Sequence, residues 1–389
     1  MRRGELLQIS RRHALRALAA FAGSSPLLPQ QDPFRDDSRI PGLREMTNAF
    51  DFEPVAYAKL PRAVYDYPAD GADSGFTLRR NREALDWVEL LPRRLTDAAA
   101  PRTATEILGT KMAFPLLVSP TAGHGALDPD GEMATHKGAA AASNTPMIVS
   151  NNSSFPFDKI AAAAAGPVWF QLYPKPALDA NRQALDKAQE AGCRAVVVTV
   201  DQQATASERS LHDRNLAPIR RTSARSAPPN PYRVPDYRLW YEWKFFDEIR
   251  PHVRVPLLAK GILTAEDARL CLEHGLDGIY VSNHGGRSLD YAPSTLEVLP
   301  EIVDAVQGRV PILLDSGIRR GSDILKALAL GANAVCIGRV PLWGLGAFGA
   351  AGVQRVLEIL QAELVQAMSY AGRPTLASID RSLATTNFP

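Results

Sequence analysis

The sequence is poor in cysteine, in net charge and in long apolar runs. Its 389 residues contain only three cysteines, Cys193, Cys271 and Cys336, which lie far apart and form no Cys-x-x-Cys pair. We therefore expect buried free thiols, with neither a disulfide framework nor a metal site. The formal net charge of +2 argues against a nucleic-acid partner. No stretch approaches the roughly 20 apolar residues that a membrane span requires.

What the chain does contain is typical of a large folded protein. Hydrophobic residues make up 46% of the sequence and charged residues 22%. This balance excludes collagen-like, disordered and small disulfide-stapled classes. At this length the chain can bury a sizeable core, either as one large α/β barrel or as two smaller domains.

The N-terminus has features of an export signal. Ser10-Arg11-Arg12 precedes an Ala/Leu-rich run over 14–22, which ends in the small-x-small pattern of Ala20-Phe21-Ala22. This resembles a twin-arginine signal, which predicts export to the periplasm. The alternative is a basic amphipathic helix or flexible arm on a cytoplasmic protein, because Arg16 interrupts the apolar run. We expect residues 1–44 to be signal and linker, and 45–389 to form the folded domain.

Short apolar runs rich in β-branched residues recur from about residue 110 onward. Eight such runs predict strands covered on both faces. They are 115–119, 147–150, 168–173, 195–200, 255–260, 278–282, 310–315 and 333–338. Helical patterns lie between most of them, as at 130–142, 178–191, 265–274 and 323–330. Eight strands alternating with helices predict a (β/α)8 TIM barrel, with a doubly wound sheet as the rival.

Two segments depart from the simple repeat. Residues 45–109 precede the barrel and are expected to form helices and a small N-terminal cap. The connection after the fourth strand, 201–254, is more than twice the length of the others and rich in Arg and Pro. An insertion of that kind at the carboxyl end of a strand is typical of a lid or substrate loop.

Polar residues gather where the predicted strands end, as in the active sites of barrel enzymes. The loops after the seventh and eighth strands combine glycines with arginines ahead of helices, around Gly317, Arg319, Gly338 and Arg339. Backbone N–H groups and guanidinium suit a dianionic phosphate. Glycine caps beside surface arginines are the alternative.

His284 is the strongest catalytic candidate among the seven histidines. It follows a buried strand, and Gly285 and Gly286 beside it would let a ligand approach. Arg287 adds a carboxylate-binding cation to the same loop, so that a base and an anion site lie together. His124 is a second candidate or merely faces the site. Surface roles are expected for the others that we considered, which are His136, His252 and His274.

Two further charged residues end predicted strands. Asp201 could orient His284 and raise its basicity, or could be a turn or N-cap aspartate. Lys260 would be a buried cation that forms a Schiff base, pairs with an acid, or faces an electron-rich cofactor edge.

The residues 282–290, Ser-Asn-His-Gly-Gly-Arg-Ser-Leu-Asp, resemble the signature of the FMN-dependent α-hydroxy-acid oxidases and dehydrogenases, the glycolate oxidase and lactate oxidase group. The segments 260–269 and 315–321 are similar to that family as well, and the resemblance runs from about residue 60 to 372. It implies an FMN enzyme that oxidises an L-2-hydroxy acid to the 2-oxo acid.

The resemblance also implies site residues. The flavin ring and ribityl chain would be held by Pro120, Thr121, Ala122, Ser150, Gln171, Thr199, Lys260 and Ser282, with Lys260 near N1 and O2. The ribityl and phosphate end would fall to Asp315, Gly317, Arg319, Gly338 and Arg339. His284 would be the base, assisted by Asp201, and Arg287 would bind the substrate carboxylate with Tyr67 and Tyr173; Tyr173 is also counted among the catalytic residues.

Several positions depart from the family pattern. The aromatic pair near the cap is Tyr67-Pro68 here, Asn152 stands where a Trp is frequent, and Ser316 replaces a common Gly. A second carboxylate-binding arginine would be Arg209, but an ungapped alignment puts Glu208 there. The pocket wall is therefore expected to differ from that of the family.

Other functions compete with this interpretation. An FMN-barrel isomerase or a phosphate-binding aldolase could share the phosphate loops and Lys260, and a flavin-binding barrel without turnover could retain the fold. The electron acceptor is left open between O2, a quinone and a cytochrome. The resemblance also implies a homo-oligomer, commonly a tetramer.

Overall fold

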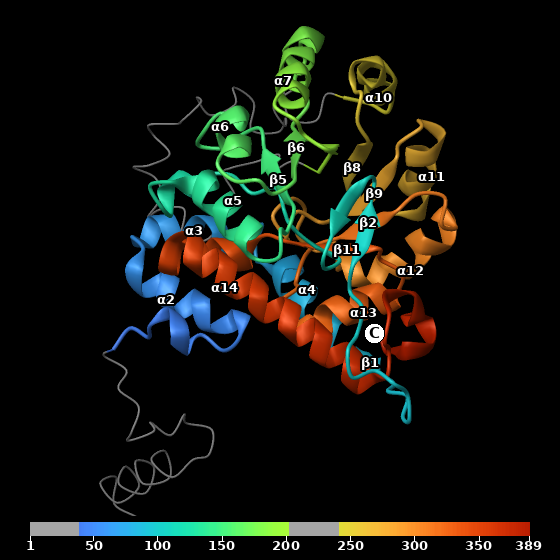
Figure 1. Ribbon diagram of the computed structural model, residues 1–389. Coiled ribbons are helices and arrows are strands. Elements are labelled where there is room, and N and C mark those ends of the chain that lie inside the picture. Colours follow the sequence, from blue (N-terminus) through green and yellow to red (C-terminus); the bar gives the residue numbers. More distant parts are fainter. Residues whose placement is uncertain (1–38, 202–240) are drawn as a thin grey trace, which may run out of the picture. The chain divides into compact units, whose positions relative to one another are not determined.

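The computed structural model describes residues 39–201 and 241–389 (Figure 1). Contacts divide the chain into Met1–Pro41 and Gly42–Pro389, and the second unit holds every helix and strand given below. The predicted twin-arginine segment lies outside the described residues. So do Arg209 and most of the long connection after the fourth barrel strand, so the lid and the second arginine stay predictions.

Eight parallel strands form a closed barrel, which confirms the predicted (β/α)8 fold. They pair in chain order from β4 to β11, and β11 closes the ring by pairing with β4. Their bounds are β4 (Leu116–Val118), β5 (Met147–Ser150), β6 (Val168–Leu172), β7 (Val196–Thr199), β8 (Leu257–Ile262), β9 (Gly278–Val281), β10 (Ile312–Leu314) and β11 (Ala334–Ile337). Each predicted strand agrees with its observed bounds within two residues.

The strands are mostly apolar because both of their faces are covered. One set of side chains fills the barrel interior and the other packs under the helices. The interior set includes Leu117, Ile148, Trp169, Val197, Leu258, Tyr280, Leu313 and Cys336. The three cysteines are buried and free, as expected.

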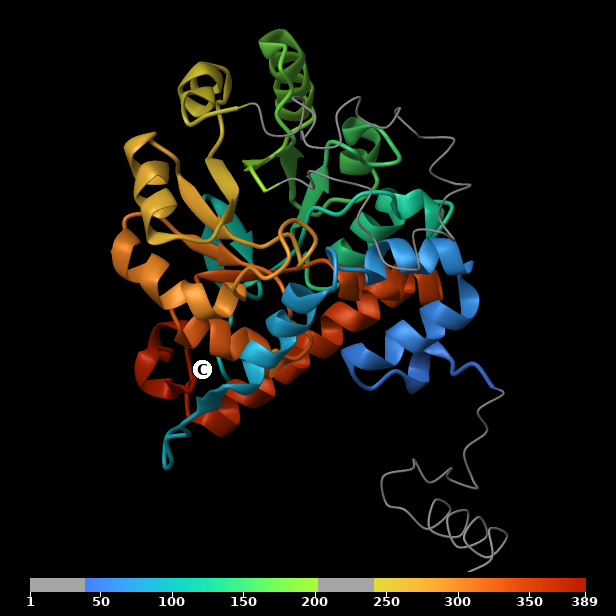
Figure 2. The ribbon, with the colours of Figure 1, turned by 180° about the vertical axis from the view of Figure 1, so that it is seen from behind.

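Helices follow the strands on the outside of the barrel, as the two opposite views show (Figures 1 and 2). They are α5 (Gly131–Ala141), α6 (Phe157–Ala162), α7 (Leu178–Glu190), α10 (Lys244–Ile249), α11 (Ala265–Glu273), α12 (Thr295–Val306), α13 (Gly321–Ala329) and α14 (Arg339–Ala371). Short 3-10 turns are η1 (Leu43–Glu45), η2 (Ala49–Asp51), η3 (His124–Ala126), η4 (Arg250–His252), η5 (Leu376–Ser378) and η6 (Arg381–Leu383). The long α14 is kinked at Phe348 and Gly349, where the backbone leaves helical geometry.

The segment before the barrel contains the expected helical cap, made of α2 (Phe52–Lys59), α3 (Arg62–Ala69) and α4 (Phe76–Asp86). Helices α2 and α3 pack on α14, along which they lie in Figure 1. Two pairings were not predicted. β1 (Val88–Leu90) pairs with β12 (Ala384–Thr386) near the C-terminus, and β2 (Thr105–Ile107) forms a hairpin with β3 (Thr110–Met112).

The hairpin closes the amino end of the barrel. Ile107 and Met112 join the cluster of interior side chains, and the Trp169 indole N–H donates to Thr110 Oγ1 at 3.0 Å. Active-site chemistry is thereby confined to the opposite, carboxyl end of the strands. Among the described helices, none has the length and apolar character needed to cross a membrane.

The surface role expected for His136 is wrong. This side chain is fully buried where α5 packs on α6, with Nδ1 2.7 Å from the Ile160 carbonyl oxygen and Nε2 3.1 Å from that of Gly166. The alanine-rich pattern of α5 did not reveal that its histidine faces inward. His274 is partly exposed and pairs with Asp247 at 2.9 Å.

Candidate active site

His284 and Asp201 meet at the carboxyl end of the barrel. His284 follows β9, Asp201 follows β7, and the His284 Nδ1 to Asp201 Oδ1 distance is 2.9 Å. Because an aspartate carboxylate can only accept, Nδ1 donates to it, and in the neutral ring the lone pair is then on Nε2. His284 has a φ of 59°, an uncommon value for a non-glycine residue and one that often occurs at functional sites.

Asp201 is held as a carboxylate by its neighbours. Burial raises its pKa, but Lys260 and His284 outweigh that effect, so the pKa lies below its ordinary value. The Lys260 Nζ lies 3.8 Å from Asp201 Oδ1. Gly261 follows in β8 at a φ of 115°, and a Cβ there would come within 2.6 Å of the Asp201 Cβ. A glycine at this irregularity is what allows Asp201 to approach β8.

Tyr173 lies beside the Nε2 atom of His284. Its hydroxyl oxygen is 3.4 Å from His284 Nε2, and the two rings are stacked with centroids 6.4 Å apart. The predicted catalytic set of His284, Asp201 and Tyr173 is therefore brought together in one place.

Arg287 and Tyr67 lie together at the outer rim. Arg287 Nη1 donates to the backbone carbonyls of Tyr67 and Asp70, the latter at 3.2 Å. The guanidinium carbon is 4.9 Å from the centre of the Tyr67 ring, which is 44% exposed. The cap helix α3 and the loop after β9 thus place a cation and a phenol side by side.

A second arginine, Arg339, ties the same two segments together. Its guanidinium donates to the carbonyls of Pro68 at 2.6 Å, Gly285 at 2.9 Å and Asp70 at 2.9 Å. Burial, with Arg287 and Arg319 nearby, lowers the pKa of Arg339 to about 9. Burial and then Arg82 lower that of Arg319 to about 10. A cluster of poorly solvated cations is an environment that an anionic group would stabilise.

At the ends of β6 and β7, two buried side chains have polar atoms without a hydrogen-bond partner among the described residues. They are both amide atoms of Gln171, at the end of β6, and the hydroxyl of Thr199, at the end of β7, and each residue is 1% exposed. Such groups are costly unless a ligand pairs with them. With Lys260 beside them, they fit the carbonyl and N–H edges of a flavin ring.

The structure places the whole predicted cofactor set at this end of the barrel. The members lie in the strand ends and the loops that follow them: Pro120, Thr121, Ala122, Ser150, Gln171, Thr199, Lys260, Ser282, Asp315, Gly317, Arg319, Gly338 and Arg339. No group of three or more His, Cys, Asp or Glu within residues 39–201 and 241–389 is arranged to hold a metal ion.

Several supporting residues were missed by the sequence analysis. Asn283 and Asn81 of α4 exchange hydrogen bonds at 2.7 and 3.0 Å, so the cap is fixed to the His284 loop. Asp290, part of the signature, accepts from the backbone N–H groups of Ser74 at 3.0 Å and Thr77 at 2.9 Å, which caps α4. No periodicity distinguishes such residues, because their partners lie some 200 positions away in the chain.

His124 is fully buried and positions Thr121. Its Nδ1 is 2.8 Å from Thr135 Oγ1, which itself donates to the Gly131 carbonyl at 3.3 Å. Thr135 therefore accepts from Nδ1–H, and His124 Nε2 accepts the Thr121 hydroxyl proton at 2.7 Å. The Thr121 oxygen is left to act as an acceptor toward the site.

Burial lowers the pKa of His124 to about 4, which predicts a pH-dependent stability. Above pH 6.5 the ring is neutral in both states, so it adds no pH dependence to the free energy of unfolding. Below pH 6.5 the unfolded chain binds a proton at His124, whereas the native state does not until about pH 4. The free energy of unfolding should therefore fall by up to about 3 kcal/mol between pH 6.5 and pH 4 from this group.

Urea unfolding of FMN-saturated protein at several pH values measures this effect. His124→Gln keeps a donor and an acceptor but does not titrate, so its unfolding free energy should depend less steeply on pH in that window. His252→Gln is the matched control at a histidine that is only partly buried. An unchanged slope in His124→Gln would contradict the assignment.

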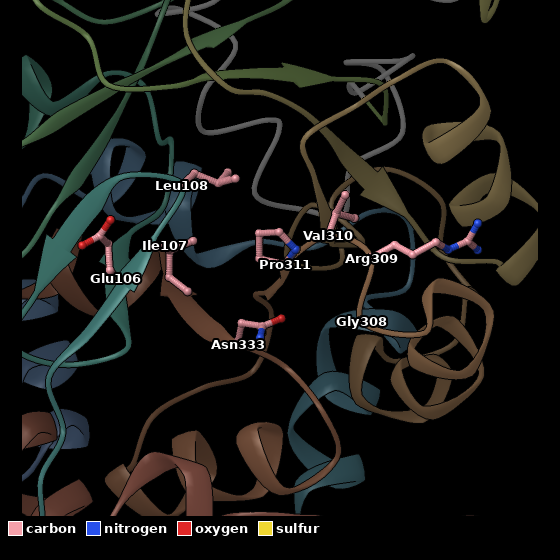
Figure 3. A pocket seen from close by; sticks show the side chains of 8 residues that line it. All are labelled: Glu106, Ile107, Leu108, Gly308, Arg309, Val310, Pro311 and Asn333. Atoms are coloured by element: carbon pink, nitrogen blue, oxygen red, sulfur yellow. The ribbon is translucent and has the colours of Figure 1, made fainter.

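A shallow hollow of about 330 Å³ lies at the other end of the barrel (Figure 3). It is lined by the β2–β3 turn around Leu108 and by Pro311 and Asn333, which directly precede β10 and β11. The amino end of a barrel serves stability rather than chemistry, and the hollow is remote from His284.

Comparison with known proteins agrees with this geometry. The family model described as FMN-dependent dehydrogenase matches residues 56–386. The chain is 39% identical to peroxisomal (S)-2-hydroxyacid oxidase GLO3 of Arabidopsis thaliana, over 88% of this chain and 98% of the relative. It is 38% identical to glycolate oxidase of Spinacia oleracea, over 87% and 95%.

Solved structures show the same similarity. The crystal structure of mandelate oxidase superposes with a TM-score of 0.79 at 36% identity, covering 88% of this chain and 99% of that one. Its complex with benzoyl-formic acid gives a TM-score of 0.78. These findings set aside the aldolase and isomerase alternatives. With the unpartnered amide and hydroxyl at the strand ends and the histidine–aspartate pair beside them, the chain belongs to the family of FMN-dependent dehydrogenases.

Proposed function

We propose how this FMN-dependent 2-hydroxy-acid oxidoreductase works: His284 removes the substrate hydroxyl proton while Arg287 holds the carboxylate. The observation that carries the proposal is the His284–Asp201 pair at 2.9 Å, in which Nδ1 donates to the carboxylate, so that in the neutral ring the lone pair is on Nε2, the nitrogen beside Tyr173. A base and an anion-binding cation on one loop are what oxidation of a 2-hydroxy acid requires.

The residues at the strand ends would hold FMN. Gln171 and Thr199 would pair with the flavin ring, and Lys260 would face it with its charge. Arg319 and Arg339, with Gly317 and Gly338, would bind the phosphate end, as their lowered pKa values favour a neighbouring anion. When bound, FMN supplies the two-electron acceptor of the reaction.

The protein's own part in the reaction is to orient the substrate and move one proton. The substrate hydroxyl would donate to His284 Nε2, and the imidazolium that forms would be stabilised by Asp201. The lowered pKa of Asp201 keeps its carboxylate ionised for that purpose. Tyr173, 3.4 Å from Nε2, would hold the substrate oxygen near the base.

The substrate class is proposed from the relatives and from the rim. Arg287 and Tyr67 present a guanidinium and a phenol that suit a carboxylate, and the relatives are named for (S)-2-hydroxy acids, glycolate and mandelate. An (S)-2-hydroxy acid is therefore the expected substrate.

Anaerobic visible spectra of the purified protein test the proposal. Glycolate and the two enantiomers of lactate and mandelate are added in turn; the flavin band should bleach with one or more of glycolate, (S)-lactate and (S)-mandelate, and with neither R enantiomer. A flavin that none of them reduces would contradict the substrate class. Admitting air, a quinone or ferricytochrome c to the reduced enzyme then identifies the acceptor by the rate of reoxidation.

Export and assembly are further proposals. The N-terminal Ser10-Arg11-Arg12 segment favours periplasmic delivery as a twin-arginine cargo, and the family resemblance favours a homo-oligomer. Cell fractionation of the protein beside its Arg11→Lys/Arg12→Lys variant tests the first proposal, and light scattering the second. A monomer, or fractionation unchanged by the lysines, would contradict them.

A further inference from the structure

A buried phenol lies beneath the proposed cofactor site. Tyr280 of β9 points into the barrel interior and is 0% exposed. Its hydroxyl oxygen is 2.9 Å from Asp315 Oδ2 and 3.0 Å from Ser119 Oγ. A tyrosine in this layer costs desolvation of its hydroxyl, which these two contacts repay.

The direction of both hydrogen bonds follows from the chemistry of the groups. Burial and the Asp315 carboxylate raise the pKa of Tyr280 well above its ordinary value, so the phenol keeps its proton. Asp315 as a carboxylate only accepts, so the phenol donates to it. Ser119 must then donate to the phenol oxygen. A relay therefore runs from Ser119 through Tyr280 to Asp315.

Asp315 shares a cation with Asp201. The Lys260 Nζ is 4.0 Å from Asp315 Oδ2 and 3.8 Å from Asp201 Oδ1, and 5.5 Å from the centre of the Tyr280 ring. One ammonium thus stands between two carboxylates, neither of them close enough for a short hydrogen bond. How much of its charge is available to a ligand depends on how strongly each carboxylate attracts it.

Ser316 adds to the same arrangement. It adopts a φ of 79°, in a region that favours glycine, and its hydroxyl donates to Asp315 Oδ1 at 2.8 Å. Both oxygens of Asp315 therefore receive a hydrogen bond from a neutral hydroxyl. Each such bond partly neutralises the Asp315 carboxylate and so weakens its attraction for the Lys260 ammonium.

We propose that Tyr280 is a positioning residue that sets the reduction potential of the bound FMN, by donating to Asp315 and so keeping the Lys260 charge directed at the cofactor. The inference rests on the proposed placement of Lys260 against the flavin. Bound FMN gains negative charge on reduction. The Lys260 ammonium therefore stabilises the reduced form more when Asp315 attracts it less strongly. This role is independent of which hydroxy acid is oxidised.

Tyr280→Phe tests the proposal, because it removes only the hydroxyl. The equilibrium constant for two-electron reduction of bound FMN should fall about tenfold, which corresponds to a potential about 30 mV more negative. Flavin reduction by the substrate should slow while KM changes little, since Arg287 is untouched. The potential is measured by titration with a reference dye, which needs no hydroxy acid.

Thr110→Val is the matched control. It removes a buried hydroxyl from a hydrogen bond to an interior aromatic residue, Trp169, at the other end of the barrel. Its flavin potential should equal that of the unmodified protein. An equal potential in Tyr280→Phe, or a more positive one, would overturn the inference while leaving the proposed function intact. Failure of hydroxy acids to reduce the unmodified protein would instead count against the proposed function alone.

A double-mutant cycle isolates the relay. Ser119→Ala should lower the potential in the same direction as Tyr280→Phe but by less, and should have no further effect when combined with it. Additive shifts would show that Ser119 acts by another route and would contradict the relay. If Tyr280→Phe does not fold, Ser119→Ala alone decides, since an unchanged potential there would overturn the proposal.

Discussion

Replacing His284 by alanine should leave FMN bound and slow its reduction by a hydroxy acid by about 10² to 10⁴-fold, the usual contribution of a general base. The loss follows from the geometry, because Nε2 carries the lone pair and Asp201 at 2.9 Å stabilises the proton that it takes up. Anaerobic stopped-flow measurement of flavin bleaching gives the rate directly.

His252→Ala is the control for this variant. His252 lies in η4, on the segment that leads into β8 at the amino end of the barrel, and its loss should not alter the rate. Loss of FMN from His284→Ala would show that His284 stabilises the cofactor-binding loop, and would not support its role as the base. A rate near that of the unmodified protein would remove His284 from the role of base.

The barrel could be predicted because its strands are covered on both sides. Runs such as Met147–Ser150 and Val196–Thr199 are buried at every position, so continuous apolar stretches of strand length, rich in β-branched residues, indicated them. The site followed from the same pattern, since polar residues such as Lys260 and Asp315 fell at the carboxyl ends of the predicted strands. The predicted fold was therefore enough to locate the site, without knowledge of any contact between side chains.

The connections within the site could not be predicted. In the sequence, Tyr280 is one residue of a continuous buried strand. It contacts Asp315 only because its side chain points into the barrel. Asn81 and Asp290 act on partners more than 200 positions away, in a cap whose docking no local pattern encodes. Local sequence fixes which residues occupy an element, whereas these contacts depend on how elements pack.

The cap and the catalytic loop are joined by arginines rather than by apolar contact alone. Arg287 and Arg339 both donate to the Asp70 carbonyl, and Arg339 also reaches the Gly285 carbonyl beside His284. A change in the position of α3 would therefore be transmitted to the base. The rim that is proposed to bind the substrate therefore also helps to position His284.

Arg287→Lys should raise KM for the hydroxy acid by about 10- to 100-fold with a smaller change in kcat, as expected for a lost charge-assisted hydrogen bond. In the structure Nη1 is held by the Tyr67 and Asp70 carbonyls, which fixes the plane of the guanidinium against the Tyr67 ring. The planar fork can then offer its remaining donors to a carboxylate in a fixed geometry. A lysine keeps the charge but has neither the fork nor the stacking.

Steady-state kinetics with the best substrate of the panel measures the effect. Arg79→Lys is the control, because Arg79 is exposed and donates only locally, to the Ser74 carbonyl at 3.0 Å. An equal fall in kcat and kcat/KM would mean that Arg287 acts chiefly in the transition state. An unchanged KM would place the carboxylate elsewhere, and Arg209 in the loop after β7 would then be the next residue to replace.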